Sequence, residues 1–224
     1  NELAKQQNLI EKLKSLEKTN NSFLNKKATG YDPEIITVNK KVYSSHRVAP
    51  LKIELWKRKN ETSEKDLIIF MPGLGGDINN FRWVGNELSK RGWPILFIDH
   101  KGSNSEALLE VLEGSETVPS SADLFLYRIK DLEAVIKAHN NGKFGLENNS
   151  YILMGHSLGA LIAFLYEGDL PKDDFEKRCD LALKDFAVTN LSKLIQCQLT
   201  EIPLPEIINS KKANGIIGFN SFGS

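Results

Sequence analysis

Residues 151–159 read Tyr-Ile-Leu-Met-Gly-His-Ser-Leu-Gly, an apolar run that ends in a serine between two glycines. Where a strand turns sharply into a helix, the two pass so close that a Cβ at Gly155 or Gly159 would clash. The serine between them, Ser157, is held at strained backbone angles that raise its hydroxyl above the sheet end. Residues 160–165 are apolar and open a helix. The stretch predicts a nucleophile elbow with Ser157 as nucleophile, the alternative being an ordinary glycine-flanked turn.

Strands and helices are predicted to alternate along the rest of the chain. Continuous apolar runs are typical of strands buried on both faces, whereas amphipathic segments between them predict helices. This order favours an α/β fold in which a mostly parallel sheet has helices on both faces, with an antiparallel hairpin at one edge. We expect strands at residues 35–43, 51–56, 67–71, 95–98, 151–154 and 213–219, and helices at 81–92 and 121–142. Residues 103–119 are expected to form a long loop, with room for a helical turn near residues 108–112.

The chain divides into a short helix and a core. Residues 1–27 place Leu and Ile at three- and four-residue steps among Lys, Glu and Gln, which predicts an N-terminal amphipathic helix. Packing of this helix onto its own domain is favoured over contact with a partner protein. Residues 28–224 are expected to form the α/β core, interrupted at residues 168–212 by an irregular, lid-like insert. Short helical pieces are expected in this insert around residues 180–183 and 191–199.

Composition excludes several classes of partner. The 224 residues include 29 basic and 29 acidic side chains, so neither nucleic acid nor an anionic membrane is indicated. No apolar stretch approaches the roughly 20 residues that span a bilayer. The first twenty residues are polar and show no secretory signal, so we expect a cytoplasmic protein. The two cysteines, Cys179 and Cys197, lack metal-site spacing and are expected to be buried free thiols.

A second glycine-rich segment, residues 72–76, contains a candidate hydrogen-bond donor for an oxyanion hole. A carbonyl attacked by Ser157 becomes an oxyanion, which needs two hydrogen-bond donors aimed at it. The backbone N–H of Leu158, directly after the serine, is the first candidate. The second is the N–H of Leu74, because its flanking glycines let the backbone approach a substrate. A plain glycine turn is the alternative.

These segments also carry a family resemblance. Residues 72–75 (Pro-Gly-Leu-Gly), 88–93 (Leu-Ser-Lys-Arg-Gly-Trp), 99–103 (Asp-His-Lys-Gly-Ser) and 155–160 (Gly-His-Ser-Leu-Gly-Ala) contribute to it. By them the chain resembles the α/β-hydrolase family over about residues 65–220. It looks closest to the predicted dienelactone-hydrolase and platelet-activating-factor-acetylhydrolase-like branch, including cyanobacterial members. One departure is Pro72, where members often have histidine, which leaves open how the loop is hydrogen-bonded.

The resemblance implies a serine hydrolase of carboxylic esters, such as an esterase or lipase, that forms an acyl-enzyme on Ser157. It implies no metal and no organic cofactor. The substrate is expected to be a small ester, and the Leu-, Ile- and Pro-rich insert suggests an apolar or lipid-like acyl group. The sequence does not indicate an oligomeric state.

The catalytic base is missing from the pattern. The family's triad runs in chain order serine, acid, histidine, but none of the four histidines, His46, His100, His139 and His156, follows Ser157. We therefore expect a fragment that lacks the last two strands of the sheet and is inactive, because a serine without a base is a poor nucleophile. The alternative is a non-catalytic hydrolase-fold module for binding or interaction.

The remaining polar residues are expected to be structural. His156 cannot readily reach the neighbouring hydroxyl and is expected to pack beside the sheet. His100 and Asp99 are read as sheet-end residues, with a pocket-lining role for His100 as the alternative. His46 and His139 are expected to face solvent. Arg128 and Asp131, three positions apart on one helix, are predicted to form a surface ion pair of little energetic weight.

Overall fold

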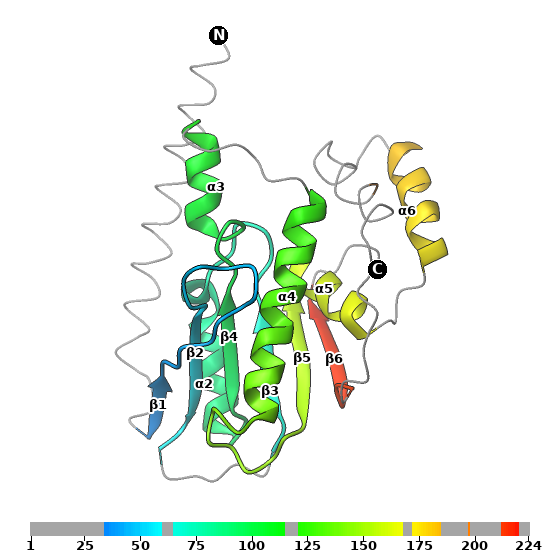
Figure 1. Ribbon diagram of the computed structural model, residues 1–224. Coiled ribbons are helices and arrows are strands. Elements are labelled where there is room, and N and C mark those ends of the chain that lie inside the picture. Colours follow the sequence, from blue (N-terminus) through cyan, green and yellow to red (C-terminus); the bar gives the residue numbers. More distant parts are fainter. Residues whose placement is uncertain are drawn as a thin grey trace.

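The computed structural model of the protein describes residues 34–59, 65–114, 121–167, 172–184, 197 and 212–219. In these residues six strands form one sheet in the order β1-β2-β4-β3-β5-β6 (Figure 1). The strands are β1 (Ile35–Val38), β2 (Lys52–Arg58), β3 (Leu67–Met71), β4 (Ile95–Asp99), β5 (Tyr151–His156) and β6 (Gly215–Phe219). The helices are the 3₁₀ helix η1 (Ile78–Phe81) and the α-helices α2 (Arg82–Lys90), α3 (Ser105–Leu112), α4 (Ser121–Asn140), α5 (Leu158–Glu167) and α6 (Lys172–Lys184).

The sheet has one antiparallel edge and a parallel centre. β1 pairs antiparallel with β2 and β2 with β4, whereas β3 pairs parallel with both β4 and β5, and β5 with β6. This confirms the predicted edge hairpin and the mostly parallel sheet. Parallel strands end at the same edge, so the loops after β3, β4 and β5 meet there.

Each central strand contributes side chains to two apolar layers. In β3, for example, Leu67 and Ile69 pack with α4 and α5, whereas Ile68 and Phe70 pack with η1 and α2. Figure 1 shows α4 in front of the sheet and α2 behind it. All five residues of β3 are buried, because both faces of the sheet are covered. The expectation of helices on both faces is confirmed.

Three elements differ in extent from expectation. Strand β1 ends at Val38, whereas a strand was expected to residue 43. Where a long loop with a helical turn near residues 108–112 was expected, the eight-residue helix α3 forms, and its Leu108 lies against Gly75. The insert carries the helix α6, longer than the short helical pieces expected there.

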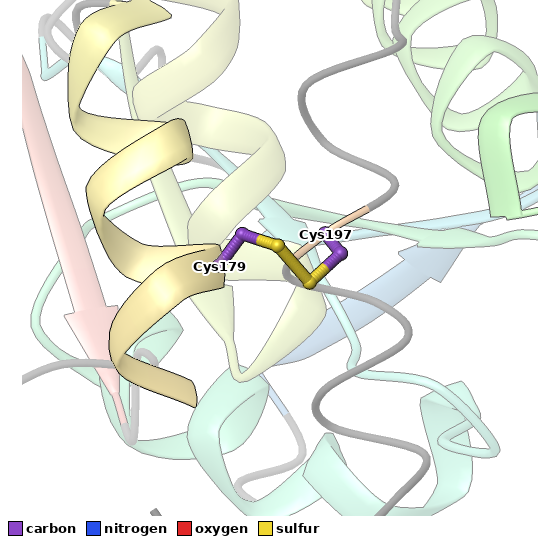
Figure 2. The surroundings of a disulfide bond; sticks show 2 residues. All are labelled: Cys179 and Cys197. Atoms are coloured by element: carbon purple, nitrogen blue, oxygen red, sulfur yellow. A yellow bond between two sulfur atoms is a disulfide. The ribbon is translucent and has the colours of Figure 1, made fainter. Parts of the chain in front are cut away.

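The cysteines are bonded to each other rather than free. Cys179 on α6 and Cys197, 18 positions later, form a disulfide with a Cα–Cα distance of 4.5 Å (Figure 2). The prediction of two free thiols was wrong because spacing along the chain does not show that α6 turns one cysteine toward the other.

Several expectations lie outside the described residues. The helix predicted at 1–27 is one of them, and so is most of the insert at 168–212, so the division into domains stays a prediction. Among the helices that the structure describes, none combines the length and the apolar character that a membrane crossing requires.

Candidate active site

Ser157 occupies the turn between β5 and α5 with strained backbone angles. Its φ is 52°, and it is the one non-glycine residue with positive φ in the described part of the chain. This conformation is costly for a residue with a Cβ and persists only where neighbours hold it. Here the Ser157 N–H donates to the Phe219 carbonyl at 2.8 Å, and the Ser157 carbonyl accepts from Ala160 N–H at 3.0 Å. The predicted elbow geometry is therefore present.

The glycines on either side of the serine are there for steric reasons. A Cβ on Gly155 would overlap the backbone of Gly159, and a Cβ on Gly159 would overlap the Met71 carbonyl of β3. Helix α5 can start this close to the sheet only because both side chains are absent.

The glycine-rich loop after β3 lies directly against the serine. A Cβ on Gly73 would lie 3.1 Å from the Ser157 Cβ. The loop is a tight turn in which Gly76 N–H donates to the Gly73 carbonyl at 3.2 Å. Within the described residues, no backbone carbonyl accepts from the N–H of Leu74 or Leu158. Of the two candidate oxyanion donors, Leu74 is thus in the loop after β3 and Leu158 is the first residue of α5, and the N–H of each is without a backbone acceptor among the described residues.

The buried side chain of Arg128, on α4, hydrogen-bonds to this loop. Its guanidinium donates to the Pro72 carbonyl at 2.6 Å, the Gly73 carbonyl at 3.0 Å, and Ser103 Oγ and carbonyl at 2.9 and 3.2 Å. Arg128 is 1% exposed, so the predicted surface ion pair was wrong. Burial lowers its pKa to about 9, opposed by the nearby carboxylates of Asp131 and Asp99.

A sequence signal for this burial existed. Arg128 follows Phe125 by three positions and precedes Leu132 by four, so it lies on the stripe of α4 that faces the core. A charged residue on such a stripe indicates that its side chain is buried and forms hydrogen bonds inside the protein.

Asp131, one turn further along α4, is the centre of a second buried cluster. Its carboxylate accepts from Arg47 Nε at 2.7 Å and Nη2 at 2.6 Å, and His100 Nδ1 lies 3.0 Å from Oδ2. His46 Nε2 is 3.4 Å from Oδ1. Burial alone would raise the pKa of Asp131, but the hydrogen bonds from His100 and Arg47 lower it. Burial, with the nearby Arg128 charge, lowers the pKa of His100 to about 4, so His100 is neutral at pH 7.

The structure describes all four histidines, and none is hydrogen-bonded to Ser157. His100 has the structural role expected of it. His46 was expected to be exposed, but its ring stacks on Tyr127 with centroids 4.7 Å apart. His139 was also expected to face solvent, yet it is 1% exposed with Nε2 3.2 Å from the Ser150 carbonyl. Both expectations failed because the partners are distant in sequence: Tyr127 of α4 for His46 and the segment before β5 for His139.

His156 and Asp99 complete the set of sequence-predicted polar residues. The His156 ring lies 5.5 Å from the ring of Phe81, in agreement with a packing role. Asp99 accepts from Asn104 Nδ2 at 2.8 Å and pairs with Lys52 Nζ at 2.7 Å, as a residue that ties the sheet end to the next loop. In the described part of the chain, no group of three His, Cys, Asp or Glu side chains could hold a metal ion.

Comparisons with known proteins identify a family and support the fold. The family model described as serine aminopeptidase S33 matches residues 62–177, just over half of the chain. No curated protein matches the chain in sequence. The esterase Est22 superposes with a TM-score of 0.51 at 14% identity, over 71% of this chain and 48% of the esterase. Esterase B from Lactobacillus rhamnosis gives a TM-score of 0.47 at 13% identity, over 69% and 47%.

The chain spans about half the length of these esterases, and the likeness to Est22 concerns the fold. The sheet order, the elbow and the family match lead to one assignment. The chain belongs to the serine aminopeptidase S33 family of α/β-hydrolases.

Proposed function

We propose that the protein is a serine hydrolase of carboxylic esters in which Ser157 is the nucleophile. The observation that carries this proposal is the strained Ser157, which lies against Gly73. Beside it, the N–H groups of Leu74, in the loop after β3, and of Leu158, at the start of α5, have no acceptor in the described structure. A strained serine between two available donors is the arrangement that acyl transfer needs.

In the proposed reaction, Ser157 Oγ attacks the ester carbonyl carbon and gives up its proton to a general base. The carbonyl oxygen becomes an oxyanion, which accepts hydrogen bonds from Leu74 N–H and Leu158 N–H. The C–O bond to the alcohol then breaks, the alcohol leaves with that proton, and the acyl group stays on Ser157. A water molecule activated by the same base hydrolyses the acyl-enzyme and regenerates the serine.

No general base for Ser157 is identified among the residues described above. Since no histidine of the chain is hydrogen-bonded to Ser157, we expect the 224-residue chain by itself to be inactive or nearly so. The proposed substrate is an ester with an apolar or lipid-like acyl group, as the composition of residues 168–212 suggests. Membership of the dienelactone-hydrolase-like branch is part of the same proposal.

Labelling with a fluorophosphonate probe tests the nucleophile. Four proteins are compared: the 224-residue chain, the complete natural gene product, and the gene product with Ser157→Ala or with Ser105→Ala. Ser105→Ala is the matched control, because Ser105 Oγ donates to Asp77 on the neighbouring loop and has no proposed catalytic part. Labelling of the gene product and the control, lost in Ser157→Ala, supports the proposal. Absence of labelling in the gene product contradicts it.

The second candidate is a non-catalytic hydrolase-fold binding module, favoured by the same lack of a bonded histidine. It predicts saturable binding of a p-nitrophenyl ester to the gene product without release of p-nitrophenol. Turnover that depends on Ser157 would exclude it.

A further inference from the structure

The peptide unit between Gly73 and Leu74 has its carbonyl oxygen hydrogen-bonded to Arg128 and its N–H as a candidate oxyanion donor. The peptide is trans, so the Gly73 carbonyl and the Leu74 N–H point in opposite directions within one plane. Arg128 Nη2 donates to the Gly73 carbonyl at 3.0 Å. The carbonyl therefore faces the guanidinium, and the Leu74 N–H is turned away from it.

A single guanidinium fixes two successive peptide units of this loop. Nη1 binds the Pro72 carbonyl while Nη2 binds the Gly73 carbonyl. The planar fork of an arginine presents these donors in fixed directions. The Gly73 carbonyl also accepts from Gly76 N–H at 3.2 Å. A flip of the Gly73–Leu74 peptide would therefore break two hydrogen bonds and leave a buried guanidinium N–H unpaired. Two carbonyls of the loop that contains Pro72 are thus hydrogen-bonded to Arg128 of α4.

Arg128 is itself anchored on its other side. Nε donates to Ser103 Oγ and Nη2 also donates to the Ser103 carbonyl, in the loop after β4. The same carbonyl accepts from Gly75 N–H at 2.9 Å. None of the hydrogen bonds of the guanidinium in the described structure goes to a carboxylate, although a fully buried charge without a directly bonded partner is costly. All four of its hydrogen bonds to described residues go to backbone carbonyls and a hydroxyl of the loops after β3 and β4.

The geometry points to Arg128 as the positioning residue of the oxyanion hole: by holding the Pro72 and Gly73 carbonyls, it sets the direction of the Leu74 N–H. The catalytic meaning of this inference rests on the proposed function. The direction of the N–H bond can be measured whether or not the protein is an enzyme.

The test uses the complete natural gene product with Arg128→Met and Arg128→Lys. Lysine keeps the positive charge but lacks the planar set of N–H donors that binds two carbonyls at once. Arg128→Lys is therefore measured in place of Arg128→Met if the methionine variant does not fold. Ile129→Ala is the matched control, since Ile129 is also buried on α4 but packs in the apolar core. Residual dipolar couplings report the direction of the Leu74 N–H in ¹⁵N-labelled protein, and hydrolysis of p-nitrophenyl butyrate gives kcat and KM.

We expect both Arg128 variants to change the Leu74 coupling while the couplings of β5 stay unchanged. Their kcat should fall about 100- to 1,000-fold, the effect of losing one oxyanion donor, with little change in KM. Ile129→Ala should lower the melting temperature and keep both kcat and the Leu74 coupling.

An unchanged Leu74 coupling in a folded Arg128 variant would overturn the inference, and so would a loss of kcat no greater than in Ile129→Ala. If the unmodified gene product neither hydrolyses the ester nor reacts with fluorophosphonate, the proposed function fails. In that case the Leu74 coupling alone decides whether Arg128 sets the loop.

Discussion

Arg47 and Asp131 lie 84 positions apart in the sequence and form a two-pronged ion pair, in which Asp131 is fully buried and the Arg47 side chain is 14% exposed. Arg47 Nε and Nη2 donate to the two carboxylate oxygens of Asp131 at 2.7 and 2.6 Å. Arg47 belongs to the segment between β1 and β2, and Asp131 to α4, whose previous turn carries Arg128. The pair therefore fixes the edge hairpin to the helix that supports the glycine-rich loop.

Removal of Asp131 should be among the most destabilising changes in this fold. Asp131→Ala leaves Arg47 and His100 without their buried partner, and loss of one partner of a buried pair costs about 3–5 kcal/mol of unfolding free energy. Urea unfolding of Asp131→Ala, Arg47→Ala and the double variant measures this loss and the coupling between the two residues. Glu87→Ala, which removes an exposed ion pair with Arg91, is the control and should unfold like the parent. Equal midpoints for Asp131→Ala and the control would contradict the prediction.

His100 should make stability depend on pH in a defined range. Its pKa is lowered from 6.5 to about 4 in the folded protein, so the unfolded chain binds more protons between these values. The stability contributed by neutral His100 is complete above pH 6.5 and is lost as the pH falls toward 4, by about 3 kcal/mol. His46, whose pKa is also lowered, acts in the same direction.

Urea unfolding at intervals from pH 7.5 to 4 measures this loss. His100→Asn keeps a donor for Asp131 but cannot titrate, so its stability should fall less steeply over that range. His46→Gln separates the contribution of the second histidine. An identical slope in the parent protein and His100→Asn would show that His100 does not carry the effect.

The sequence was most informative where backbone sterics dictate residue type. Gly155 and Gly159 tolerate no Cβ, and continuous apolar runs such as β3 need cover on both faces, so the elbow and the sheet could be predicted from local patterns. Leu74 was predicted as a donor from its flanking glycines, and the structure leaves its N–H available, although its role in catalysis stays a prediction.

The buried polar clusters could not be predicted in the same way. Spacing on α4 brings Arg128 and Asp131 to the same side of the helix, but their partners come from residues 47, 72, 73, 100 and 103. Those contacts depend on how loops distant in the sequence pack over α4, and the spacing of apolar residues along the sequence does not reveal that packing. The pairing of Cys179 with Cys197 escaped prediction for the same reason.

The disulfide should contribute measurably to stability. It joins residues 18 positions apart, and closing a loop of about this length stabilises a fold by about 3 kcal/mol in the chain-entropy account. Reduction of the protein should therefore lower the urea midpoint. The double variant Cys179→Ser/Cys197→Ser should match the reduced parent and show no response to reductant. A parent midpoint that is the same with and without reductant would contradict this expectation.

The close approach of α5 to the sheet leads to a last prediction about Gly159. A Cβ at this position would overlap the Met71 carbonyl of β3, which is backbone and cannot move aside as a flexible side chain could. Gly159→Ala should therefore shift the first turn of α5 and lower the free energy of unfolding by more than about 3 kcal/mol. Gly215→Ala is the matched control, because a Cβ there would meet no atom within 4 Å. Thermal and urea unfolding should show a large loss for Gly159→Ala and almost none for Gly215→Ala. Comparable stability of the two variants would contradict the close contact between α5 and β3 at Gly159.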